Sequence, residues 1–200
     1  MSTPLSEDVN YIRTLAEEGR NAPQIGGRIL AWWSGLTAIA YTIQWAALSD
    51  RLPAFNLNYM WLGYIALGLA GMALLQRGLS TKPGARALPN RVSRAVWMSA
   101  GIGIGAYVVG VVAAVNLGAA LIVFNTIAPA VLAIYGVALL TVASLANDQL
   151  SRIAGICALV FAAAAMALVT SAESYLVAAI GILLSATAPA IVQIAREPTA

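Results

Sequence analysis

The sequence contains no histidine and only one cysteine, Cys157. A disulfide within one chain cannot form, and neither a cysteine–histidine zinc cluster nor a histidine-ligated haem can be built from these residues. Cys157 lies in an apolar stretch, where an isolated thiol behaves as a small hydrophobic side chain. We therefore expect no metal and no cofactor.

Charged residues are also scarce. Of the 200 residues, 60% are hydrophobic and 10% are charged, whereas a soluble domain would be roughly a quarter charged. This much apolar surface cannot be buried in one small water-soluble core, so the composition predicts that lipid surrounds the chain. The formal charge of +3 is better explained by membrane topology and contact with anionic lipids than by nucleic-acid binding.

The residues needed for several chemistries are missing or scattered. Hydrolysis or group transfer needs a nucleophile with a base, paired carboxylates or a metal, and the eight acids are dispersed along the chain. Ion-coupled transport usually needs an acid, histidine or lysine inside the membrane, and voltage sensing needs a series of arginines. The sequence predicts a protein that is not an enzyme, an ion-coupled transporter or a voltage sensor.

Six apolar runs have about the 20 residues needed to cross a bilayer as helices. Trp32, Trp33 and Trp45 mark the two ends of the first run, as the aromatic belts of membrane proteins do. Every charged residue lies outside the runs or at their edges, which supports their boundaries. We predict an all-α integral membrane protein, with one domain over 29–200 and transmembrane helices at about 29–49, 58–76, 95–115, 119–146, 153–170 and 174–194.

Residues 1–28 form a polar lead before the first run. Within it, apolar residues recur at helical spacing between Ser6, a suitable N-cap, and Gly19, a natural stop. The spacing predicts a short amphipathic helix over 6–19. It could lie loosely at the membrane surface or dock on a partner protein.

The connection between the second and third runs determines the expected topology. It is basic and contains no acid, whereas the first connection carries a single arginine, Arg51. The positive-inside rule places the basic connection in the cytoplasm, and with six spans both termini then lie there too, in a bacterial-type inner membrane. The residues that determine this topology are Arg77, Lys82, Arg86, Arg91 and Arg94.

Small residues gather in the third run, where Gly101 and Gly105 form a GxxxG step on one helix face. Small residues let helices approach closely in a membrane, where the hydrophobic effect does not drive them together. This face could pack within the chain or form the seam of an oligomer.

Two prolines, Pro129 and Pro189, lie inside predicted helices and leave the carbonyl groups four residues earlier without a helical partner. Such carbonyl groups, with nearby polar side chains, could line a wet cavity or be satisfied by neighbouring helices. The candidate cavity residues are Gln44, Asn125, Thr126, Pro129, Ser185 and Pro189.

Taken together, these patterns favour a non-catalytic polytopic inner-membrane protein. It would act as an accessory, scaffold or oligomer-forming subunit through helix–helix contacts, with membrane lipids, itself or another membrane protein as partners. Two alternatives remain open: a channel or facilitator for a small uncharged solute, and a protein that binds lipid or another hydrophobic ligand between its helices.

Overall fold

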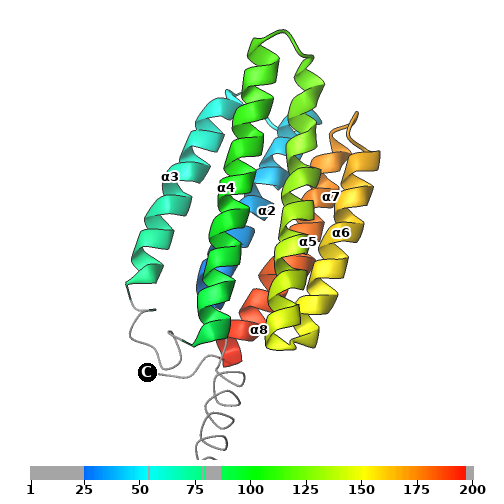
Figure 1. The fold of residues 1–200 in the computed structure, drawn as a ribbon. Coiled ribbons are helices and arrows are strands. Elements are labelled where there is room, and N and C mark those ends of the chain that lie inside the picture. Colours follow the sequence, from blue (N-terminus) through cyan, green and yellow to red (C-terminus); the bar gives the residue numbers. More distant parts are fainter. Residues whose placement is uncertain (1–24, 54, 78, 80–86, 197–200) are drawn as a thin grey trace, which may run out of the picture.

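The computed structural model describes residues 25–53, 55–77, 79 and 87–196, and Figure 1 shows their arrangement. These residues are mostly helical and include no strand. The predicted helix over 6–19, together with Lys82 and Arg86, lies outside the described residues. The elements are α2 (Gly27–Leu48), α3 (Leu57–Gln76), α4 (Leu88–Asn116), the 3-10 helix η1 (Leu121–Thr126), α5 (Ile127–Ala146), α6 (Gln149–Ala167), α7 (Glu173–Ile182), the π-helical segment η2 (Leu183–Thr187) and α8 (Ala188–Arg196).

In the described part of the chain, five helical stretches are long and apolar enough to cross a membrane. They are α3, α4, η1 with α5, α6, and the continuous stretch from α7 through η2 to α8. The first predicted span corresponds to α2, which has 22 residues but is not among the five. The structure is thus that of an all-helical, polytopic membrane protein, in which α2 is the least apolar of the long helices.

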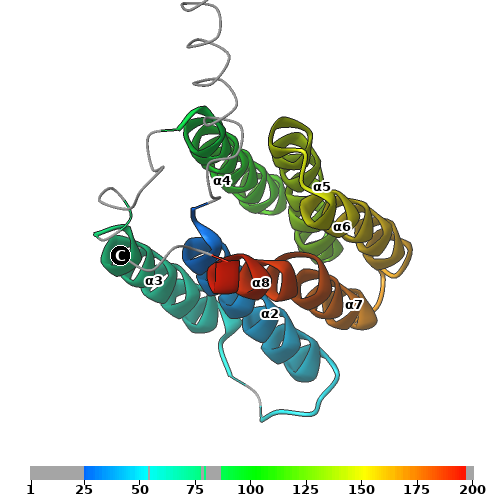
Figure 2. The same cartoon turned by 90° about the horizontal axis from the view of Figure 1, so that it is seen from below.

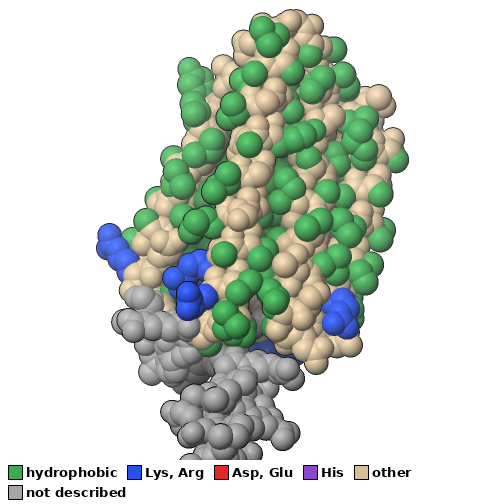
Figure 3. Space-filling model, viewed as in Figure 1, with side chains coloured by type: hydrophobic (Ala, Val, Ile, Leu, Met, Phe, Trp, Pro, Cys, Tyr) green, Lys and Arg blue, Asp and Glu red, His purple; other side chains and the backbone are tan. Residues whose placement is uncertain are grey.

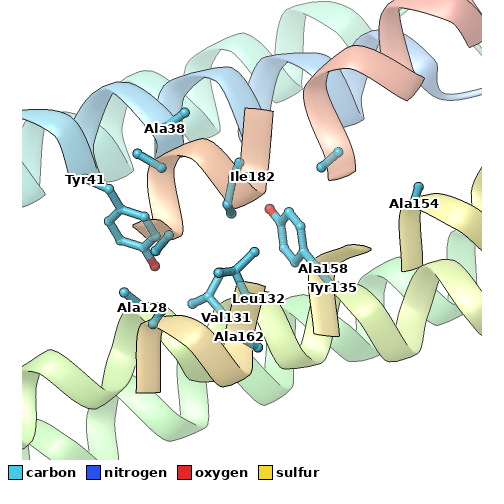
Figure 4. Close-up of a cluster of buried hydrophobic side chains, with 14 of the residues drawn as sticks. Ala38, Tyr41, Ala128, Val131, Leu132, Tyr135, Ala154, Ala158, Ala162 and Ile182 are labelled. Carbon is cyan, nitrogen blue, oxygen red and sulfur yellow. The ribbon is translucent and has the colours of Figure 1, made fainter. Parts of the chain in front are cut away.

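The helices form two layers, and α2 lies in the middle of one of them. Seen from below, α4, α5 and α6 lie on one side, and α3, α2 and the α7–η2–α8 stretch lie on the other (Figure 2). α2 packs against α3, α7, η2 and α8, whereas α5 packs against α4 and α6. The core between the layers combines alanines with larger side chains, including Tyr41, Leu132, Tyr135 and Ile182 (Figure 4).

Two glycines bring α5 and α6 together. A Cβ atom built on Gly136 would lie 3.0 Å from the carbonyl oxygen of Gly155, and one built on Gly155 would lie 3.0 Å from that of Gly136. Small residues permit such backbone contact, which supplies the dispersion attraction that holds helices together in lipid. The hairpin of α5 and α6 is therefore the most closely packed pair of helices.

The third helix begins earlier than the sequence predicts, at Leu88 instead of about residue 95. Pro89 lies in its first turn, where a missing N–H group has little cost. The first two turns of α4 include Arg91 and Arg94, so the prediction that these arginines lie in a connection is wrong. The helix extends beyond the apolar run because arginines are good helix formers outside the hydrocarbon.

The prolines are accommodated by changes of helix type. Pro129 is the third residue of α5, directly after η1, so the predicted fourth helix starts as a 3-10 helix at Leu121. Pro189 follows η2, where the backbone widens into a π-helix. Proline donates no hydrogen bond to the residue four positions earlier, and π-helical turns are one way in which a helix absorbs such a break.

The charged residues among those described lie at the two ends of the bundle. One end carries Arg28, Arg77, Arg91, Arg94, Asp148, Arg152 and Arg196, and the opposite end carries Asp50, Arg51 and Glu173. Lys and Arg side chains gather at the lower end of the visible face in Figure 3, while its middle is mainly apolar. This separation leaves an uncharged belt around the bundle, as a bilayer requires.

Candidate functional site

A column of polar side chains runs along α2 through the interior of the bundle. Ser34, Thr37, Tyr41 and Gln44 recur at steps of three and four residues, so they share one face of the helix. All four are buried, and Gln44, the most exposed, has only 8% of its surface accessible. The most polar side of α2 therefore faces protein, which explains how a helix of modest hydropathy fits into the bundle.

Hydrogen bonds from other helices meet this column at three levels. The Thr187 hydroxyl of η2 donates to Ser34 Oγ at 2.9 Å. The Thr37 hydroxyl of α2 lies 2.8 Å from the hydroxyl of Tyr64 in α3. At these two levels, side-chain hydroxyl groups attach both η2 and α3 to α2.

The third level lies nearer the end of α2, where the Gln44 side-chain oxygen accepts a hydrogen bond from Trp61 Nε1 at 3.1 Å. Aromatic rings continue the column here. Tyr41 makes edge contacts with Trp61, at 6.0 Å between ring centres, and with Tyr175 of α7, at 5.8 Å. Such edge-to-face pairs add stability beyond the area they bury, so this end of α2 is joined to α3 and α7.

The residues predicted to line a cavity come from five different elements. Gln44 belongs to the column on α2, while Asn125 and Thr126 lie in η1. Ser185 belongs to η2, and the buried Pro129 and Pro189 lie in α5 and α8.

The polar groups of these candidates are held by the chain itself. Asn125 Nδ2 donates to the carbonyl oxygen of Val169 at 2.8 Å, and Ser185 Oγ donates to that of Gly181 at 2.6 Å. Thr126 Oγ1 donates to the Val123 carbonyl oxygen at 2.6 Å. A shallow apolar depression of about 210 Å³ between α2 and η2 contains none of the six candidates and is lined by Ala38, Ile39, Thr42, Ile43 and Leu183.

α4 meets the bundle along a narrow seam. Asn90, Trp97, Ile104 and Val111 follow one another at intervals of seven residues, the spacing of a coiled-coil seam. The Trp97 ring lies edge-on to Tyr135 of α5, with centres 5.3 Å apart. At the seam's lower end, Asn90 Oδ1 accepts a hydrogen bond from the backbone N–H group of Ile25, 3.0 Å away.

The predicted glycine face lies outside this seam. A Cβ atom built on Gly101 or Gly105 would meet nothing within 4 Å, so these glycines do not pack against the described chain. On α3 the outcome is different, because Gly68 and Gly71 make room for the rings of Trp33 and Trp32 of α2.

A second set of small residues on α4 lies on the face opposite the seam, and the sequence patterns considered above do not include it. Its members recur at steps of four and three residues, so they form one stripe, and all of them are exposed. We call this set the small-residue stripe: Ser99, Gly103, Ala106, Gly110 and Ala113. The alternating spacing could have revealed it, but a search for GxxxG finds only Gly101 and Gly105 in this helix.

Comparisons of the chain with protein-family models, with curated proteins and with solved structures found no match. Among the residues that the structure describes, no group of three or more histidine, cysteine, aspartate or glutamate side chains could hold a metal ion. The function must therefore be inferred from the packing and polarity of the helices.

We predict that the Thr37–Tyr64 contact couples α2 to α3. Thr37→Val and Tyr64→Phe each remove one hydroxyl group of the pair, and a double-mutant cycle on thermal unfolding in detergent should give a coupling of about 0.6 kcal/mol, and at most about 1.7 kcal/mol. Thr141→Val is the matched control, since its exposed hydroxyl bonds only to the Val137 carbonyl oxygen in its own helix. Additive effects of the two changes would contradict the coupling.

Proposed function

We propose that this protein is a non-catalytic inner-membrane protein that works through lateral helix–helix contacts, as an accessory, scaffold or oligomer-forming subunit. The observation that carries the proposal is the uneven burial of its membrane helices. In α3 and in α4, only 6% of the most apolar 18-residue window is buried inside the protein. In the other three candidate spans, the buried share of that window is 33% to 56%. Two of the helices thus contribute little to the protein's own core.

The small-residue stripe on α4 supports a protein partner at this surface. Its members expose backbone rather than large side chains, and close backbone approach is what favours helix association in lipid. The large exposed side chains of α3, such as Leu62 and Leu69, offer ordinary lipid contact instead. We therefore assign the partner contact to the stripe, with the flank of Gly101 and Gly105 as the competing face.

The proposed topology places the basic end of the bundle, with both termini, in the cytoplasm. The support is the separation of charge between the two ends. The basic end has a single acid, Asp148, among its described residues, whereas Asp50 and Glu173 lie at the opposite end with Arg51. By the positive-inside rule, an excess of arginine marks the cytoplasmic side.

We predict that changes in the stripe disrupt a complex without unfolding the protein. A Cβ atom added at Gly103 or at Gly110 would have no neighbour within 4 Å, so Gly103→Leu with Gly110→Leu should leave the fold intact while blocking close approach. Native mass measurement after extraction in mild detergent should show a second copy or another subunit with the unaltered protein and its loss in the double variant.

Gly101→Leu with Gly105→Leu is the matched control, because these glycines are equally open but lie on a different face of α4. Retention of the complex in this control and its loss in the stripe variant would support the assignment. An unaltered protein that is a bare monomer in mild detergent, and gives no cross-link from Gly103→Cys in native membranes, would rule out the proposed function.

The topology predicts opposite labelling of two connections. In a Cys157→Ala background, Leu52→Cys should react with an impermeant maleimide in intact cells, because Leu52 lies at the outer end and is 40% exposed. Thr81→Cys, in the basic connection, should react only after the membrane is opened. The reverse pattern would overturn the orientation.

A facilitator for a small uncharged solute is the second candidate. The buried polar column on α2 favours it, since hydroxyl and amide groups along one line inside a bundle can replace the water around a neutral solute. This proposal predicts solute-dependent swelling of proteoliposomes that falls in Gln44→Leu and in Asn125→Leu but not in Thr141→Val. Absence of swelling, or swelling that is indifferent to both changes, would remove this candidate.

A further inference from the structure

A line of exposed residues on α4 combines positive charge with open backbone. Arg91, Arg94, Met98, Gly101 and Gly105 follow one another at steps of three and four residues, so they share one flank of the helix. All five are exposed, and at the two glycines a Cβ atom would have no neighbour within 4 Å. We call this set the arginine–glycine strip; it is distinct from the small-residue stripe, which lies opposite the seam.

The two arginines of the strip have no ionic partner in the described part of the chain. The only acid described at this end of the bundle, Asp148, is held elsewhere. Its carboxylate accepts hydrogen bonds from the backbone N–H groups of Leu150 and Ser151 and, at 2.6 Å, from the Ser151 hydroxyl. The strip therefore presents positive charge that the described residues leave unneutralised.

The helix that carries the strip, α4, does not pack against α3. α3 packs against α2, and α4 packs against α5 and η1, so the two consecutive helices do not form a packed interface with each other. Both views show α3 and α4 apart from one another (Figures 1 and 2). In Figure 3, basic side chains lie at the lower end of the visible face of the bundle.

The length of the strip fits one leaflet of a bilayer. Gly105 lies eleven positions after Arg94, which corresponds to roughly 16 Å along an α-helix. The hydrocarbon of one leaflet is about 15 Å thick. A charge at the lipid headgroups would thus be followed, beyond the exposed Met98 side chain, by two open glycines within the depth that an acyl chain occupies.

From the charge, the openness and the length of the strip, we propose that it binds an anionic phospholipid. Arg91 and Arg94 would take the phosphate group, because a guanidinium group presents paired donors that match phosphate oxygens. One acyl chain would lie along Gly101 and Gly105, where the missing side chains leave room against the helix backbone. The site rests on the membrane placement proposed above, but it needs no protein partner.

The test is lipid retention after purification, followed by native mass measurement in nanodiscs of phosphatidylglycerol and phosphatidylethanolamine. The unaltered protein should retain phosphatidylglycerol in preference to phosphatidylethanolamine. Each basic residue near an anionic membrane is worth roughly fivefold in affinity, so Arg91→Gln with Arg94→Gln should lower retention by roughly twenty- to thirtyfold. Arg152→Gln, at the same end but on α6, is the matched control and should retain the lipid.

Two further variants separate the parts of the site and the two proposals. Gly101→Leu with Gly105→Leu fills the acyl path and should lower retention of long-chain lipid while leaving any binding of a short-chain analogue unchanged. Gly103→Leu with Gly110→Leu, which tests the protein contact, should retain the lipid. Lipid retention by this stripe variant therefore distinguishes failure of the lipid site from failure of the proposed partner contact.

Four outcomes would overturn the lipid site. The first is equal retention of the two lipids by the unaltered protein. The second is an arginine double variant that retains as much phosphatidylglycerol as Arg152→Gln does. The third is a protein cross-linked at Gly101→Cys in native membranes, which would show that a partner helix occupies the strip. The fourth is displacement of the lipid by inorganic phosphate at equal concentration, which would show that the arginines bind a free anion only.

Discussion

The buried polar face of α2 is the constraint on which the rest of the bundle depends. In lipid, a polar side chain that faces outward loses its hydrogen bonds to water and gains nothing in return. Ser34 and Thr37 donate to carbonyl oxygens of their own helix, and η2 and α3 supply the further hydrogen bonds of Ser34, Thr37 and Gln44. α2 can therefore lie only where other helices surround that face, and the two layers are arranged around it.

The remaining helices satisfy a different requirement. α5 and α6 carry few polar groups toward each other and associate through backbone contact at Gly136 and Gly155. α4 is attached by its seam, through Trp97 and its neighbours at seven-residue spacing, and by a hydrogen bond from the Tyr107 hydroxyl to Thr126 Oγ1 of η1 at 2.8 Å. The centre of the bundle is thus joined by many contacts, whereas α4 at its flank is held by one ring contact, a few apolar side chains and two hydrogen bonds. A flank of this kind has surface to offer to lipids and to other proteins.

The sequence predicts the positions of the long helices well, because hydropathy alone limits where a chain can cross a bilayer. It places the start of α4 too late, since Arg91 and Arg94 resemble residues of a connection although they can continue a helix into the headgroup region. The role of Thr37 could not be predicted, because a threonine that bonds only within its own helix looks the same in a sequence as one that, like Thr37, also reaches another helix. Whether a glycine packs against another helix also depends on its neighbours in the fold. The neighbours of Gly68 are the ring atoms of a tryptophan of α2, while Gly101 has none within the described chain.

The hydrogen bond between Thr187 and Ser34 joins residues 153 positions apart in the chain. α2 therefore leaves the ribosome well before η2, which covers it at Ser34. Until η2 is made, Ser34 can donate to carbonyl groups of its own helix, chiefly that of Leu30, but its oxygen lacks the donor that Thr187 supplies. A nascent chain cut short before Leu183 would hold a complete α5–α6 hairpin beside an α2 that lacks the contact of η2 at Ser34.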